Sequence, residues 1–263
     1  METLGIIMIG DVVGEPGLDV LERTLPGLIQ THAADFVIVN GENAAAGFGM
    51  TKGVLTRILD AGADAVTSGN HVWEKRDFWP VMDENKRILR PANYPAGVPG
   101  LGWNRFEKAG LSWIVINLQG REFMTAIDCP FKTFDALAAQ AGEGSIILVD
   151  FHAESTREKE SLAYYVDGRA HLVAGTHTHI QTADERILPQ GTGYITDMGM
   201  TGVLEGILGM DPKICLDRAR TQVLYRMECA GPAADRPPAL QGIAAKLDRD
   251  TRRTLSLTRI HTV

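Results

Sequence analysis

The stretch GTHTH contains two histidines whose side chains could take part in chemistry, because of their residue type and their spacing. His177 and His179 lie two residues apart, directly after an apolar run at 171–175 that is typical of a buried strand. Because side chains alternate along a strand, both imidazoles would face the same side. Such a pair can bind a metal, but an incidental polar pair explains an isolated H-x-H equally well. The residue types at the ends of the other predicted strands distinguish between these two interpretations.

Four other apolar runs also end in groups that bind metals or move protons. The runs at 4–10, 35–40, 64–69 and 145–150 lead into carboxylate, amide or imidazole side chains, namely Asp11, Glu42, Asn43, Asn70, His71 and His152. Ligands of α/β sheets bind beyond the carboxyl ends of the strands, so we expect these groups to meet at one edge. Each has an ordinary alternative, such as a helix cap or a turn, but coincidence at five strand ends is a poor explanation.

The residue types favour a particular metal site. Imidazole together with carboxylate suits Mn, Fe or Zn, whereas an all-oxygen set would suggest Mg or Ca. The candidates are too many for one tetrahedral ion and include no cysteine, which disfavours a structural zinc. Two ions roughly 3.5–4 Å apart that share a carboxylate would use the whole set and stabilise charge on a phosphoryl oxygen. We therefore interpret His177 and His179 as ligands, one for each of two Fe or Mn ions, with Zn as the alternative.

The elements that must position these groups alternate between strands and helices. Helical patterns cover 18–33, 51–62, 72–86, 131–142 and 156–168, with Thr51 as an N-cap and Gly62 as a C-terminal stop. Two further segments, 104–118 and 240–260, have the pattern of strand pairs joined by tight turns. We predict an α/β fold in which two mixed sheets pack on each other between flanking helices, in a single domain over residues 1–263.

The composition limits the partners. Of the 263 residues, 44% are hydrophobic, which suits one large core, and the formal net charge is −7. An acidic chain is not expected to coat long nucleic acid, although one local site can hold a small phosphorylated ligand. The three cysteines are widely spaced, and neither a signal-peptide pattern nor an apolar run of membrane length is present. We expect a cytoplasmic protein without a membrane partner.

The ordered set GD, GEN, GNH, a single His and GTHTH resembles the calcineurin-like metallophosphoesterases. More narrowly, it is similar to their YmdB-like branch, which is associated with 2′,3′-cyclic nucleotide phosphodiesterase activity. Stretches at 90–95, 117–121, 149–159 and 194–202 extend the similarity over most of the chain. The chain departs from the wider superfamily where Val13 replaces the histidine of D-x-H and where NGEN replaces GD-x-x-D. The resemblance implies a four-layer αββα metallophosphoesterase sandwich.

The resemblance also implies a role for each candidate. Glu42 would bridge two metals, and His71 would be the general acid that protonates the leaving oxygen. The other residues would hold the ions in two groups, Asp11, Asn43 and His179 for one and Asn70, His152 and His177 for the other. Asn43 would stand in for the missing histidine, with a turn role as its alternative. The implied reaction is hydrolysis of a small phosphate ester, from 2′,3′-cyclic nucleotides to 3′-nucleotides.

Other functions remain open from the sequence. The same ligands would serve a phosphomonoesterase or nucleotidase, or a metal-bearing regulatory or RNA-processing partner protein with weak catalysis. Amidohydrolases also use H-x-H, but normally on the first strand of a barrel rather than the fifth strand. The Met- and Gly-rich stretch 198–210 is expected in a loop over the cleft or at the contact of a homo-oligomer. Trp73, Arg121 and Asp197 are weaker candidates for base stacking, phosphate contact and the cleft wall.

Overall fold

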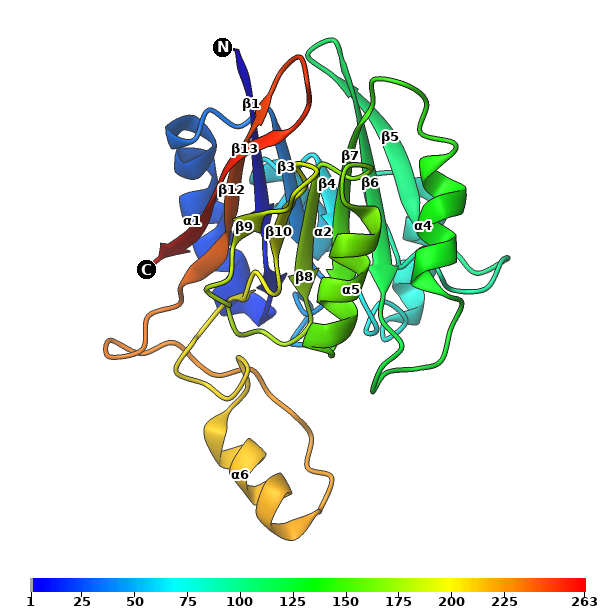
Figure 1. Ribbon diagram of the computed structural model, residues 1–263. Helices are drawn as coiled ribbons and strands as arrows, with labels where there is room; N and C mark the ends of the chain where they lie inside the picture. The colour runs from blue at the N-terminus through cyan, green and yellow to red at the C-terminus, as the bar shows by residue number, and fades with distance from the viewer. Residues whose placement is uncertain (1) are drawn as a thin grey trace.

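The computed structural model describes residues 2–263, and its centre is a pair of β-sheets (Figure 1). The first sheet has the strand order β13-β12-β1-β3-β4. Its members are β1 (Thr3–Ile9), β3 (Phe36–Asn40), β4 (Ala65–Thr67), β12 (Leu240–Asp248) and β13 (Thr254–Thr262). β1, β3 and β4 run parallel, whereas β12 is antiparallel to both β1 and β13. The sheet is therefore mixed, as predicted.

The second sheet has the strand order β5-β6-β7-β8-β10-β9. Its strands are β5 (Trp103–Lys108), β6 (Leu111–Gln119), β7 (Ile146–His152), β8 (Leu172–Thr176), β9 (Arg186–Ile187) and β10 (Gly193–Ile195). β6, β7, β8 and β10 are parallel, and antiparallel β5 and β9 form the edges. A two-stranded pair, β2 (Asp11–Val12) and β11 (Met200–Thr201), lies next to the first sheet.

Helices cover the outer face of each sheet, which completes four layers. α1 (Gly14–Thr31) and α2 (Lys52–Asp60) pack on the first sheet, and α4 (Pro130–Ala138) and α5 (Thr156–Val166) pack on the second. A separate apolar core fills the space between the sheets. Strands buried on both faces need continuous apolar runs, and every residue of β7 is buried. The predicted αββα architecture is confirmed.

Two helical segments differ from the sequence prediction. In place of a helix over 72–86, the chain forms turns, the 3₁₀ turn η1 (Arg76–Phe78) and the short α3 (Trp79–Glu84). Pro80 explains the late start, because proline fits the first turn of a helix but not its interior. The structure also adds α6 (Pro212–Thr221), which the sequence did not predict and which extends away from the sheets in Figure 1.

The remaining predicted elements lie where the sequence places them. Thr51 caps α2, since its hydroxyl accepts a hydrogen bond from the N–H of Val54 at 3.3 Å. The turn between β5 and β6 uses positive φ at Ala109 and Gly110, as tight hairpins require. Among the described residues, we find no helix that is both long and apolar enough to cross a membrane.

Candidate metal centre

Four side chains from four chain segments converge on one point at the carboxyl ends of the strands. The Nε2 atom of His152 lies 3.0 Å from an Oε atom of Glu42, 3.0 Å from Oδ1 of Asn70 and 3.0 Å from Nδ1 of His177. Ligand atoms that bind one metal ion at ~2.1 Å lie about 3.0–3.4 Å from their neighbours. The three distances from Nε2 of His152 are therefore those expected between neighbouring ligands of one ion.

The strand ends bring these side chains together from both sheets. β3 and β4 of the first sheet lead directly into Glu42 and Asn70, and β7 ends at His152. The register places His152 opposite Thr176 on β8, one residue before His177. Parallel strands present their carboxyl ends at one edge, so two packed sheets with the same polarity collect all four groups there.

Glycine at position 69 makes this approach possible. A Cβ atom at Gly69 would lie 2.2 Å from the His152 ring and 2.3 Å from Oε2 of Glu42. Both distances are below any real carbon contact, and neither buried neighbour can move away. The GNH motif therefore needs its glycine for space, a requirement that the sequence analysis did not identify.

Each of the three histidines has an oxygen within reach of the ring nitrogen that faces away from the cluster. Nδ1 of His152 lies 2.9 Å from the Thr176 hydroxyl, and Nδ1 of His179 lies 3.0 Å from the carbonyl oxygen of Leu208. In His177 the Nε2 atom lies 3.2 Å from the Glu154 carboxylate. When each of these nitrogens donates its proton outward, the other nitrogen keeps a lone pair for a metal.

A buried network supports His152 from behind. Asp150 accepts hydrogen bonds from the hydroxyls of Thr176 and Thr67 and from the side-chain amide of Asn40. Because the Thr176 hydroxyl donates to Asp150, it accepts the proton of His152. Asn40 in turn accepts from the backbone N–H of Glu42 at 3.1 Å. One carboxylate thereby links the orientations of a histidine and a glutamate that come from different sheets.

A second group of predicted ligands lies beside the first. Oδ1 of Asp11 and Oδ1 of Asn43 are buried and, within residues 2–263, have no hydrogen-bond partner. The Asn43 amide nitrogen donates to the carbonyl of Gly47, so its oxygen is left available. Buried oxygens without partners are costly, and a bound cation would satisfy them. In His179 the Nδ1 atom faces the carbonyl oxygen of Leu208, so its Nε2 atom is left available for the same cation.

The charges of the cluster suit a cation. Burial raises the pKa of the Asp11 carboxyl to about 6, although His179 and His152 lower it. Burial, together with His152, lowers the pKa of His177 to about 3. Burial opposes charge on Glu42 as well, yet its attraction to His152 lowers the pKa of Glu42 to about 2. Burial lowers the pKa of His152, but the same attraction to Glu42 raises it to about 9, so a metal that binds His152 must displace a proton from this ring. An ionised Glu42 and a neutral His177 are the forms in which these groups bind metals.

His71 lies at the mouth of the cluster. Its backbone N–H donates to Oε2 of Glu42 at 3.1 Å, and its Nδ1 is 3.4 Å from a carboxylate oxygen of Glu74. The ring meets Phe48 edge to face, with the centroids 5.0 Å apart. A cavity of about 540 Å³ in front of the cluster is lined by five of the predicted residues, Glu42, Asn43, His71, His177 and His179. His71 can therefore face a molecule bound at the cluster.

A buried ion pair anchors the loop that carries two of the histidines. His177 and His179 both have positive φ, 96° and 64°, which costs energy for residues other than glycine. Between them, the N–H and hydroxyl of Thr178 donate to Asp197 at 3.1 and 2.7 Å. Lys159, also buried, donates to the same carboxylate at 2.7 Å. Asp197 thus holds the strained loop and does not line the cleft.

Two other weak candidates lie outside the cluster. Trp73 packs edge to face against Trp79 and Tyr94 and contacts the core under the first sheet. Arg121 donates to the sulfur of Cys129 and does not line the cavity at the cluster. The ordinary interpretation of core packing holds for Trp73.

Two packed mixed sheets with such a cluster at their carboxyl ends define a fold of the metallophosphoesterase class, and the cluster indicates use of a divalent metal. The chain belongs to the YmdB-like protein family, whose model matches residues 7–260. It is 44% identical over 256 residues to a 2′,3′-cyclic-nucleotide 2′-phosphodiesterase of Bacillus subtilis, with 97% of this chain and 96% of the relative covered.

Two solved structures agree with this assignment. A hypothetical protein from Thermus thermophilus has a TM-score of 0.90 and 37% identity, over 98% of this chain and 99% of that one. A structure described as a novel phosphatase of Mycoplasma pneumoniae has a TM-score of 0.93 and 29% identity, over 100% and 94% of the two chains. The family resemblance inferred from the motifs is confirmed.

Proposed function

We propose that this protein is a dimetal phosphodiesterase that opens 2′,3′-cyclic nucleotides to 3′-nucleotides. The observation that carries the proposal is the convergence of Glu42, Asn70 and His177 on the Nε2 atom of His152 at 3.0 Å each. Two imidazole lone pairs, a carboxylate and an amide oxygen at this distance favour a shared cation. The likeness to the Bacillus subtilis phosphodiesterase supports the substrate class.

The ligand groups divide between two ions. Asn70, His152 and His177 would hold one ion, and Asp11, Asn43 and His179 the other, with the Glu42 carboxylate between them. Fe or Mn suits the mixture of imidazole, carboxylate and amide donors better than Mg or Ca. When bound, such a pair of ions supplies an activated water and neutralises charge on the phosphoryl oxygens.

His71 supplies the proton that the departing oxygen needs. Imidazole can hold and release a proton near neutrality, and this ring lines the cavity in front of the cluster. The hydrogen bond from its backbone to Glu42 ties its position to the cluster. When a water oxygen bonds to phosphorus and the bond from phosphorus to the 2′ oxygen breaks, a proton from His71 on that oxygen gives a free 2′-hydroxyl and a 3′-monophosphate.

A product analysis tests this proposal. Metal-loaded protein should convert 2′,3′-cyclic AMP to 3′-AMP, with far slower release of free phosphate, when the products are separated by chromatography. Rapid phosphate release from nucleoside monophosphates would make the protein a phosphomonoesterase instead. Full metal occupancy without turnover of either substrate would favour a metal-bearing regulatory protein.

We also propose a cytoplasmic location, for which the three free cysteines are suited.

A further inference from the structure

A second, larger cavity joins the one in front of the cluster. It has a volume of about 1150 Å³, and it shares Phe48, His71, Arg218 and Met227 with the inner cavity of about 540 Å³. The proposed proton donor therefore stands where the two cavities meet. A volume of ~300–1,000 Å³ suits a ligand the size of one nucleotide, so the inner cavity alone has room for a mononucleotide. The outer cavity has room for more.

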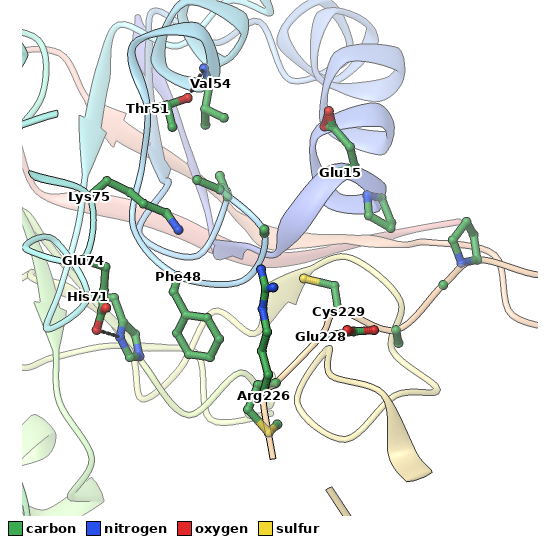
Figure 2. Close-up of a pocket in the computed structure, with 18 of the residues that line it drawn as sticks. Glu15, Phe48, Thr51, Val54, His71, Glu74, Lys75, Arg226, Glu228 and Cys229 are labelled. Atoms are coloured by element: carbon green, nitrogen blue, oxygen red, sulfur yellow. Dashed lines mark hydrogen bonds and ion pairs between the residues drawn. The ribbon is translucent and has the colours of Figure 1, made fainter. Parts of the chain in front are cut away.

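One wall of the outer cavity comes from the segment around α6. None of the residues of α6 is buried, and Figure 1 shows the helix standing beyond the carboxyl ends of the strands. From this segment, Arg218, Tyr225 and Arg226 line the outer cavity. In Figure 2, Arg226 reaches into the space beside Phe48, and Lys75 points toward the same space from the side of His71.

The cations of the outer cavity have no carboxylate partner. Within residues 2–263, the side chains of Lys75, Arg218 and Arg226 form no ion pair. The carboxylates on the same walls are partly engaged: Glu15 pairs with Arg57 at 2.6 Å, and Glu74 lies near His71. The Glu228 carboxylate also lines this cavity and forms no ion pair in the described part of the chain. An acidic protein thus presents three cations without acidic partners beside its proposed catalytic group.

Aromatic rings accompany these cations. Phe48 lies at the junction, and Tyr225 is 44% exposed on the outer wall. Positive groups that track a backbone, interleaved with rings on which bases stack, are the recurring features of single-stranded nucleic-acid sites. With a volume of about 1150 Å³, the outer cavity has room for a short chain end and is not a surface that coats long nucleic acid.

We propose that the outer cavity binds the nucleotides that precede a 2′,3′-cyclic phosphate at the 3′ end of an oligoribonucleotide. The terminal cyclic phosphate occupies the inner cavity, and Arg226 and Lys75 contact the phosphodiesters next to it. This inference rests on the proposed function, because it assumes that the cyclic phosphate binds at the cluster. It extends the substrate class from free cyclic nucleotides to chain ends.

Kinetics on two substrates test the inference. A trinucleotide that ends in a cyclic phosphate should have a KM about tenfold below that of 2′,3′-cyclic AMP for the metal-loaded protein. Arg226→Ala and Lys75→Ala should each raise the trinucleotide KM about threefold, well beyond their effect on 2′,3′-cyclic AMP. The matched control is Arg220→Ala, an exposed arginine of α6 that lines neither cavity, and it should change neither KM.

Binding measurements separate the inference from the proposed function. A 3′-phosphorylated trinucleotide should bind more tightly than 3′-AMP, and its log Kd should be steeper in log salt by about 0.7 for each phosphate contact. Equal affinities and equal salt slopes would overturn the outer site, as would cleavage of 2′,3′-cyclic AMP without cleavage of the trinucleotide. Tight, salt-dependent trinucleotide binding without hydrolysis of either substrate would contradict the proposed chemistry and support the binding role of the outer cavity.

Discussion

Nε2 of His152 and Nδ1 of His177 lie 3.0 Å apart, and each ring directs its other nitrogen to an oxygen. With both protons placed outward, two lone pairs face each other inside a buried cluster. Such an arrangement is repulsive unless a cation or a proton lies between the rings. The outer hydrogen bonds of the histidines are therefore part of the metal site.

Thr176→Val should weaken metal binding with little loss of fold. The substitution keeps the shape but removes the hydroxyl that accepts the His152 proton and donates to Asp150. Loss of such an outer hydrogen bond typically lowers metal affinity 10- to 100-fold, which calorimetry with Mn or Zn would measure. Thr192→Val is the matched control, because this buried hydroxyl bonds only to groups far from the cluster. Equal affinity in both variants would contradict the assigned tautomer.

His71→Ala should separate proton donation from metal binding. We expect the variant to keep its metals and its affinity for substrate, because the imidazole of His71 is not among the converging ligand atoms. Turnover of 2′,3′-cyclic AMP should fall by roughly 10²–10⁴, the usual contribution of one general acid. The loss should be much smaller on a nitrophenyl phosphodiester, whose leaving group hardly needs a proton. An identical loss on both substrates would assign His71 to positioning.

The pair of Lys159 and Asp197 should be coupled to the metal site through the loop. Lys159→Met alone leaves a buried carboxylate without its cation and should cost about 3–5 kcal/mol of unfolding free energy. Combining it with Asp197→Asn should recover part of that loss, as a double-mutant cycle would show. The double variant should nevertheless bind metal more weakly than the wild-type protein, since Thr178 loses its charged acceptor. Recovery of both quantities together would mean that the pair acts on stability alone.

The site could be predicted from the sequence wherever it depends on strand ends. Asp11, Glu42, Asn70, His152 and His177 follow apolar runs, and parallel strands bring such positions to one edge. The prediction needed only the order of the runs and the chemistry of the side chains that follow them. That is why the four layers were predicted correctly and why the predicted ligand positions lie at one edge of the sheets.

The supporting residues could not be predicted in the same way. Asp150 reaches Asn40 across 110 positions and between two sheets, and no local pattern marks this contact. Gly69 is required by the distance to His152, which exists only in the folded chain. Arg218 comes from α6, a helix with no buried residue and so without a strong apolar pattern.

His171 should make stability depend on pH, away from the metal site. Its Nδ1 accepts a hydrogen bond from the N–H of Ile147 at 2.9 Å, and burial lowers the pKa of His171 to about 4. The unfolded chain takes up a proton below pH ~6.5, whereas the folded chain resists until about 4, so stability is lost as the pH falls through this window.

Urea unfolding of metal-free protein at pH 7 and pH 5 measures this effect. The wild-type protein should lose about 1–2 kcal/mol more than His171→Gln between these values, because glutamine can accept the same hydrogen bond without titrating. The same pH dependence in both proteins would show that another group is responsible.

Anomalous diffraction from crystals loaded with Mn tests the central claim most directly. We predict two peaks roughly 3.5–4 Å apart on either side of the Glu42 carboxylate. One should be bound by Asn70, His152 and His177, and the other by Asp11, Asn43 and His179. A single peak, or peaks away from Glu42, would contradict the dimetal centre.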